Sequence, residues 1–120
     1  MNYVKAYTSA ARTATPTKIV FGNYQGARGA VVVINTSAAG TSPSTTFTLQ
    51  GYDPLSNTYW TLLASAAVTA VGTTVLKVYP GLTASANAVA SDVLPSSFAV
   101  DATHGNATSH TYSVGVHLIP

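Results

Sequence analysis

The side chains that could bind a metal ion or act in catalysis are the three aspartates and three histidines, Asp53, Asp92, Asp101, His104, His110 and His117. The chain has no cysteine, which excludes thiolate nucleophiles and zinc–cysteine sites. Asp101, His104 and His110 flank one loop, HGNATS, and form the only local group with the chemistry of metal ligands. The alternative is that they are ordinary polar loop residues. We favour the alternative and predict no metal site and no cofactor.

The strand expected over residues 110–119 separates two of these histidines. Side chains alternate between the faces of a strand, so His110 shares a face with Tyr112 and Val114, while His117 lies on the opposite face. The two histidines therefore cannot bind one ion from the same strand. No G-x-S-x-G or other local motif supports a Ser-His-Asp triad. We predict that the protein is not an enzyme.

Aromatic residues gather around Trp60, which directly follows Tyr59. Exposed rings can stack on a sugar, so Trp60 and Tyr59 could form a carbohydrate-binding platform. Tryptophan is more often an anchor in the core. Strand alternation aligns Trp60 with Leu62 and Tyr59 with Leu63, so either ring could be the buried one.

Charged residues make up only 7% of the chain, against about 25% in an average globular domain. Ala, Thr and Ser replace them, and hydroxyls that find hydrogen-bond partners cost much less to bury than charges do. The composition therefore predicts a surface that a partner covers. No apolar run reaches the roughly 18 residues of a membrane span and the first residues lack a signal-peptide pattern, so we expect no membrane partner.

The five basic residues are scattered, as Lys5, Arg12, Lys18, Arg28 and Lys77, and the formal net charge is +2. Nucleic-acid binding proteins cluster their Lys and Arg, often beside stacking aromatics, so we predict no nucleic-acid partner. Residues 1–18 hold three of the five and no acid. We predict an extended N-terminal arm whose Lys5, Arg12 and Lys18 bind a partner, with the chain adding to an exposed sheet edge. The alternative is a frayed terminus.

β-Strands must position all of these side chains. Seven segments combine β-branched and aromatic residues with period-two spacing between Gly, Pro, Asn and Asp turns. They are 18–24, 30–36, 46–52, 58–64, 73–80, 97–103 and 110–119. Segment 30–36, AVVVINT, is apolar on both faces, which predicts a central strand covered on both sides. Residues 82–95 are the one place where a short helix could form.

The spacing predicts an all-β fold, an antiparallel β-sandwich or jelly-roll-like domain of seven to eight strands. Residues 1–18 form the arm and residues 19–120 the sandwich domain. We expect the core to contain Phe47, Leu49, Leu62, Leu76, Val78, Phe98, Val100, Tyr112, Val114 and Val116.

Three motifs carry a family resemblance that covers the chain from about residue 30 to residue 120. They are Gln50-Gly51-x-Asp53-Pro54, Trp60-Thr61-x-Leu63 and Thr111-Tyr112-Ser113-Val114-Gly115. With these motifs the chain resembles small, cysteine-free virion proteins of tailed bacteriophages that decorate the capsid.

The resemblance implies a decoration or cement protein, made in the host cytoplasm, that binds the major capsid protein on the outside of an icosahedral capsid. It also implies a homo-oligomer, commonly a trimer, and brings no catalytic residues. Two alternatives stay open. One is another virion role at the neck, the tail or the base of a head fibre, and the other is a carbohydrate-binding adhesion module.

Overall fold

A computed structural model describes residues 3–22 and 24–120 of the chain. Over these residues it contains nine β-strands and no helix. The strands are β1 (Tyr3–Arg12), β2 (Ile19–Phe21), β3 (Gly29–Ala39), β4 (Thr45–Asp53), β5 (Thr58–Ala64), β6 (Gly72–Val78), β7 (Val89–Ala90), β8 (Phe98–His104) and β9 (His110–Ile119). The predicted all-β class is confirmed. Nothing in this part of the chain is a helix that could cross a membrane.

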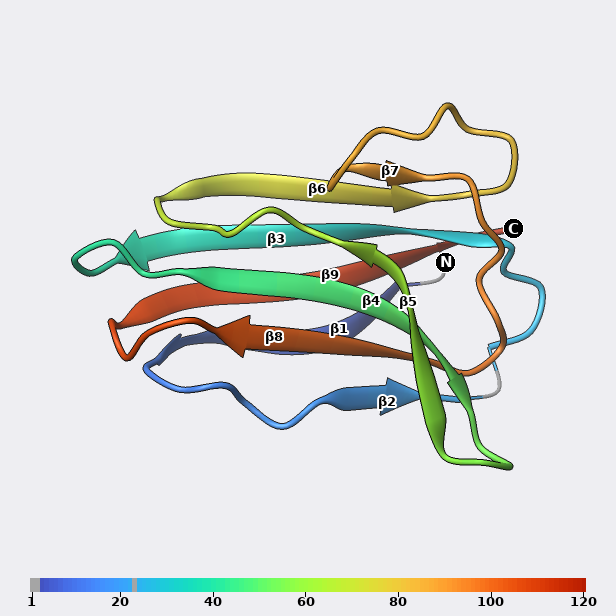
Figure 1. Ribbon diagram of the computed structural model, residues 1–120, viewed down its shortest axis with the longest axis horizontal. Coiled ribbons are helices and arrows are strands. Elements are labelled where there is room, and N and C mark those ends of the chain that lie inside the picture. The colour runs from blue at the N-terminus through green and yellow to red at the C-terminus, as the bar shows by residue number, and fades with distance from the viewer. Residues whose placement is uncertain (1–2, 23) are drawn as a thin grey trace.

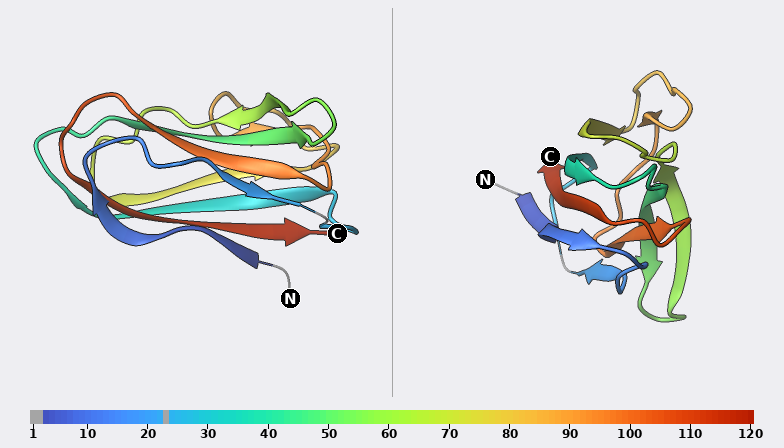
Figure 2. Two further views of the ribbon diagram at one scale, coloured as in Figure 1. Left: turned by 90° about the horizontal axis from the view of Figure 1, so that it is seen from below. Right: turned by 90° about the vertical axis from the view of Figure 1, so that its left-hand side faces the viewer.

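The strands form two sheets that face each other (Figure 1). Sheet A has the strand order β1-β9-β3-β6-β7, and sheet B has the order β2-β8-β4-β5. Neighbouring strands are antiparallel, except for the short parallel pair of β6 and β7. Figure 2 shows the two layers from two further directions. Most connections cross from one sheet to the other, so the chain closes both ends of the core.

The strand count exceeds the seven to eight expected, because β1 and β7 were not predicted. The N-terminal arm over residues 1–18 is not confirmed, since Tyr3–Arg12 forms β1 at the edge of sheet A and pairs with β9. The physical reason is a pair of register shifts in β1, which let the consecutive residues Ala6 and Tyr7 both become buried. A bulged strand of this kind lacks the period-two pattern that reveals a strand in a sequence. The helix considered at 82–95 is also absent there, and β7 lies in that stretch.

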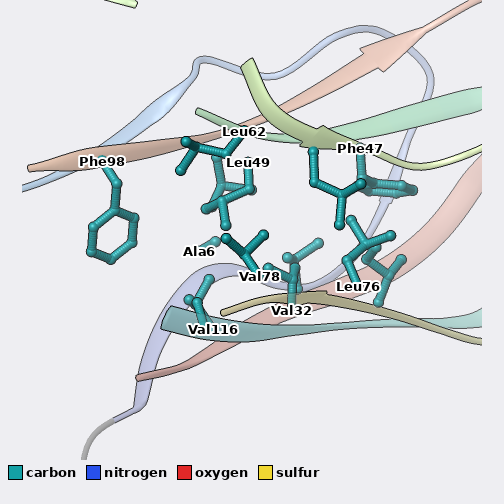
Figure 3. Close-up of a cluster of buried hydrophobic side chains, with 14 of the residues drawn as sticks. Ala6, Val32, Phe47, Leu49, Leu62, Leu76, Val78, Phe98 and Val116 are labelled. Atoms are coloured by element: carbon teal, nitrogen blue, oxygen red, sulfur yellow. The ribbon is translucent and has the colours of Figure 1, made fainter. Parts of the chain in front are cut away.

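One hydrophobic core fills the space between the sheets (Figure 3). All the residues predicted for it are buried, namely Phe47, Leu49, Leu62, Leu76, Val78, Phe98, Val100, Tyr112, Val114 and Val116. Phe47 packs edge-on against Tyr112 with ring centroids 4.9 Å apart, which joins the two sheets. The face assignment made from strand alternation is therefore confirmed.

Strand β3 is central in sheet A, as predicted, with β9 on one side and β6 on the other. Its inward residues Val32 and Ile34 are buried, whereas Val31 and Val33 point away from the core and are partly exposed. Within the described chain, β3 is thus covered on one face and not on both.

Candidate functional site

The three basic residues predicted to bind a partner do not lie on one surface. Lys5 pairs with Gly115 and lies on the outer face of sheet A. Lys18 precedes β2, and its Nζ lies 3.7 Å from the centroid of the Tyr59 ring on sheet B. Because the arm is absorbed into sheet A, its cations are distributed over the body of the molecule.

Arg12 has a structural role at the end of β1. Its guanidinium lies 4.6 Å from the centroid of the Tyr112 ring and 5.3 Å from that of Tyr7. It also donates hydrogen bonds to the main-chain carbonyls of Tyr112, Thr8 and Ala10. Burial raises the pKa of the Tyr112 hydroxyl to about 12, so Tyr112 stays neutral beneath the cation. These contacts hold Arg12 against the chain itself.

Two of the three histidines, His104 and His110, lie beside Tyr112 in the same cluster. His110 is fully buried, and its Nε2 and Nδ1 each lie 2.8 Å from a hydroxyl, of Thr36 and Thr45 respectively. His104 Nε2 lies 2.9 Å from the Tyr112 hydroxyl. Burial lowers the pKa of both histidines, and for His110 the nearby His104 lowers it further. Both ring nitrogens of His110 are therefore engaged inside the core, where a neutral imidazole is favoured.

Asp101 does not join these histidines. It lies on the outer face of sheet B, where its carboxylate accepts a hydrogen bond of 3.0 Å from Thr103. His117 is exposed on the opposite face of β9 from His110, as strand alternation predicts. Among the described residues, no group of three or more His, Cys, Asp or Glu side chains could hold a metal ion.

Trp60 and Tyr59 lie on opposite faces of sheet B. Trp60 is paired with Gly51 on the inner face, where an added Gly51 Cβ would come within 2.2 Å of its ring, and it is still 45% exposed. Tyr59 lies on the outer face beside Tyr52, with ring centroids 4.7 Å apart. The two residues therefore cannot form a single platform for one sugar ring.

A different surface emerges on the outer face of sheet A, which we define by two rows of cross-strand neighbours. One row is Lys5, Gly115, Val33 and Val75, and the other is Tyr3, His117, Val31 and Lys77. Each row runs across β1, β9, β3 and β6, so residues far apart in the sequence become neighbours. Sequence reasoning missed this surface. The only signal for it was the outward valines of segment 30–36.

The two sheets carry opposite charges. The strands of sheet A contain Lys5, Arg12 and Lys77 and no acidic residue. The strands of sheet B contain Asp53 and Asp101 and no Lys or Arg. The strands of sheet A are therefore basic and those of sheet B acidic, although the whole chain has a formal net charge of only +2.

The outer face of sheet A also contains a hollow of about 320 Å³ between β1 and β9. Its lining includes Tyr3, Lys5, Thr8, Ser9, Ser113 and Gly115. Thr8 and Ser9 lie within the second register shift of β1, between Tyr7 and Ala10, and Gly115 leaves open space above the sheet. The residues around the hollow therefore include one that carries an ammonium group and several that carry hydroxyls.

No protein-family model matches this chain, and no curated protein matches it.

Proposed function

We propose that this protein is a non-enzymatic structural protein of a virion, which binds the outside of an icosahedral phage capsid and stabilises it. The observation that carries the proposal is the outer face of sheet A, a regular sheet surface with outward valines and no acidic residue. Such a surface is suited to contact with another protein. The resemblance of residues 30–120 to phage decoration proteins supports the same role.

The fold is compatible with this role. Without β7, the strand orders β1-β9-β3-β6 and β2-β8-β4-β5 correspond to an eight-stranded jelly roll, a sandwich common in viral capsid and lectin domains. Since one fold serves many functions, the proposal rests on the surface and not on the topology.

The expected mechanism is preferential binding. A protein that binds the assembled shell more tightly than the broken one stabilises the assembled shell by mass action. Four strands about 4.8 Å apart and two rows of residues about 6.8 Å apart give this part of sheet A an area of roughly 260 Å², below the roughly 800 Å² per partner of a stable interface. One copy would then bind weakly. A homo-oligomer, with a trimer favoured, would bind through several copies of this face at once.

Two alternative functions remain as proposals. Another virion role, at the neck, the tail or the base of a head fibre, would use the same surfaces and differs only in location. Carbohydrate binding is favoured by one observation, the 45% exposure of Trp60. The position of Tyr59 on the other face of sheet B weighs against a platform built from both rings.

The test is binding of the purified full chain to empty capsids of the virus that encodes it. We expect the chain to co-sediment with the capsids, to raise their melting temperature, and to appear on their outer surface by electron microscopy. Absence of co-sedimentation at saturating concentration would contradict decoration. Density confined to the neck or tail would favour the alternative virion role, and saturable quenching of Trp60 fluorescence by glycans would favour the adhesion module.

A further inference from the structure

The centre of the outer face of sheet A is apolar where a solvated sheet should be polar. Strands of an antiparallel sheet with one wet face alternate apolar inward and polar outward residues. Strand β3 instead places Val31 and Val33 outward, and the neighbour of Val33 on β6 is Val75, which is 39% exposed. These three valines form a continuous strip on the two adjacent strands. A partner that covers this face would therefore bury apolar surface at its centre.

Two lysines flank this strip. Lys77 is on β6, directly beside Val31, and Lys5 is on the edge strand β1, three strands from β6, which corresponds to about 14 Å. No strand of sheet A contains an acidic residue that could neutralise them. A complementary partner must supply carboxylates at the rim of an apolar patch.

The charges argue against a second copy packed face to face. In a face-to-face pair each copy presents this same face, which carries Lys5 and Lys77. The sheet A strands of a second copy therefore provide no carboxylate for these lysines. Because the acids Asp53 and Asp101 belong to sheet B, the same face of another copy cannot supply what this surface needs.

The hollow beside Lys5 indicates where one carboxylate of the partner would bind. Lys5, Thr8, Ser9 and Ser113, which carry an ammonium and three hydroxyls, are among the residues that line a space of about 320 Å³. An ammonium and hydroxyls are donors, and an ionised carboxylate accepts several hydrogen bonds at once. The absence of a side chain at Gly115 leaves room for a carboxylate-bearing side chain to reach them.

We infer that the outer face of sheet A is the surface that docks on the capsid, and this inference rests on the proposed function. Its partner is a protein surface with an apolar centre and carboxylates at the rim, one of which enters the hollow beside Lys5.

Matched variants of the full chain test this assignment in the capsid co-sedimentation assay. Lys5→Glu is compared with Lys18→Glu, which makes the same charge change on the side of sheet B. Val75→Asp is compared with Val20→Asp, because Val20 is 44% exposed on β2 and points outward from sheet B. Thermal melting of each free variant confirms that it is folded.

We expect Lys5→Glu and Val75→Asp each to weaken capsid binding roughly tenfold, and the two controls to change it less than about twofold. Raising the salt concentration should weaken the wild type more than Lys5→Glu, because Lys5 is exposed and its attraction is screened.

The two proposals fail in different ways. If the wild type binds capsids and the sheet A variants bind as well as the controls, decoration stands and the docking face is wrong. If Val75→Asp lowers the mass of the free oligomer, a second copy covers the face and the inference is overturned. If the wild type does not bind, the proposed function fails, and with it the docking face.

Discussion

Acidification should destabilise this protein through His110. The imidazole is fully buried, both of its nitrogens are hydrogen-bonded to threonine hydroxyls, and burial lowers its pKa below the unfolded value of about 6.5. Above pH 6.5, roughly, both states are neutral and stability is highest. As the pH falls below that value, the imidazole of the unfolded chain binds a proton while that of the folded chain stays neutral. The free energy of unfolding therefore decreases until the pH reaches the folded pKa.

The size of this effect follows from proton linkage. One histidine that stays neutral in the folded state lowers the free energy of unfolding by at most about 1.4 kcal/mol per pH unit. Between pH 7.5 and pH 5 the total for His110 alone is at most about 2 kcal/mol, the value for a ring that stays neutral throughout, and the lowered pKa of His104 acts in the same direction.

Urea titrations at a series of pH values measure this slope. The variant His110→Gln cannot titrate, so its slope should be smaller than that of the wild type whatever its absolute stability. The matched control is His117→Gln, which makes the same substitution at an exposed position on the other face of β9. An NMR titration of the wild-type ring gives the folded pKa directly. Equal slopes in wild type and His110→Gln, or a folded pKa at or above about 6.5, would refute the reasoning.

Three further predictions concern the core, β1 and metal dependence. Truncating fully buried Phe47 or Phe98 to Ala should lower the free energy of unfolding by about 3–5 kcal/mol in urea titrations, and a loss below about 1 kcal/mol at both sites would mean that the face assignment is wrong. Deleting residues 1–12 should lower the melting temperature by roughly 10 °C or more, because Ala6 and Tyr7 leave the core and β9 loses its neighbour β1. A shift of only a few degrees would instead support the hypothesis that these residues form an arm outside the sandwich. EDTA should leave the melting temperature unchanged, and a drop that a divalent ion reverses would point to an unrecognised metal site.

The parts of the fold that sequence reasoning predicted well are those with strict alternation. The expected segment 110–119 coincides with β9, and the segment 46–52 lies within β4, where buried and partly buried residues alternate. Alternation along β9 also predicts that His110 shares a face with Tyr112 and Val114 and that His117 lies on the opposite face, as the structure has them. The reason is physical, since a strand with one buried face must place every second side chain in the core.

Bulges explain most of what sequence reasoning missed. In β1 the neighbours Ala6 and Tyr7 are both buried, and in β5 the neighbours Leu62 and Leu63 are both buried beside a register shift. Each extra residue changes which side chain faces the core, so the period-two pattern breaks. In β1 the small residues on either side of Tyr7 supplied no compensating signal, and a strand with a buried tyrosine was therefore interpreted as an arm.

The outer face of sheet A could not be predicted in this way, because it depends on the order of the strands in the sheet. Lys5 and Lys77 come from distant parts of the sequence, and only the order of strands in sheet A places them on either side of one apolar face. The topology likewise places Lys5, Arg12 and Lys77 in the strands of sheet A, and Asp53 and Asp101 in those of sheet B.

The sequence of β3 relates the prediction of the fold to the proposal of the docking face. Its run of β-branched residues predicted a strand buried on both faces, and the chain itself covers only the face that carries Val32 and Ile34. Outward valines at a regular strand position gain nothing from water, whereas burial of each against a partner contributes on the order of 1 kcal/mol. The outward valines of β3, which the chain itself leaves partly exposed, are therefore the physical reason to look for the partner on the outer face of sheet A.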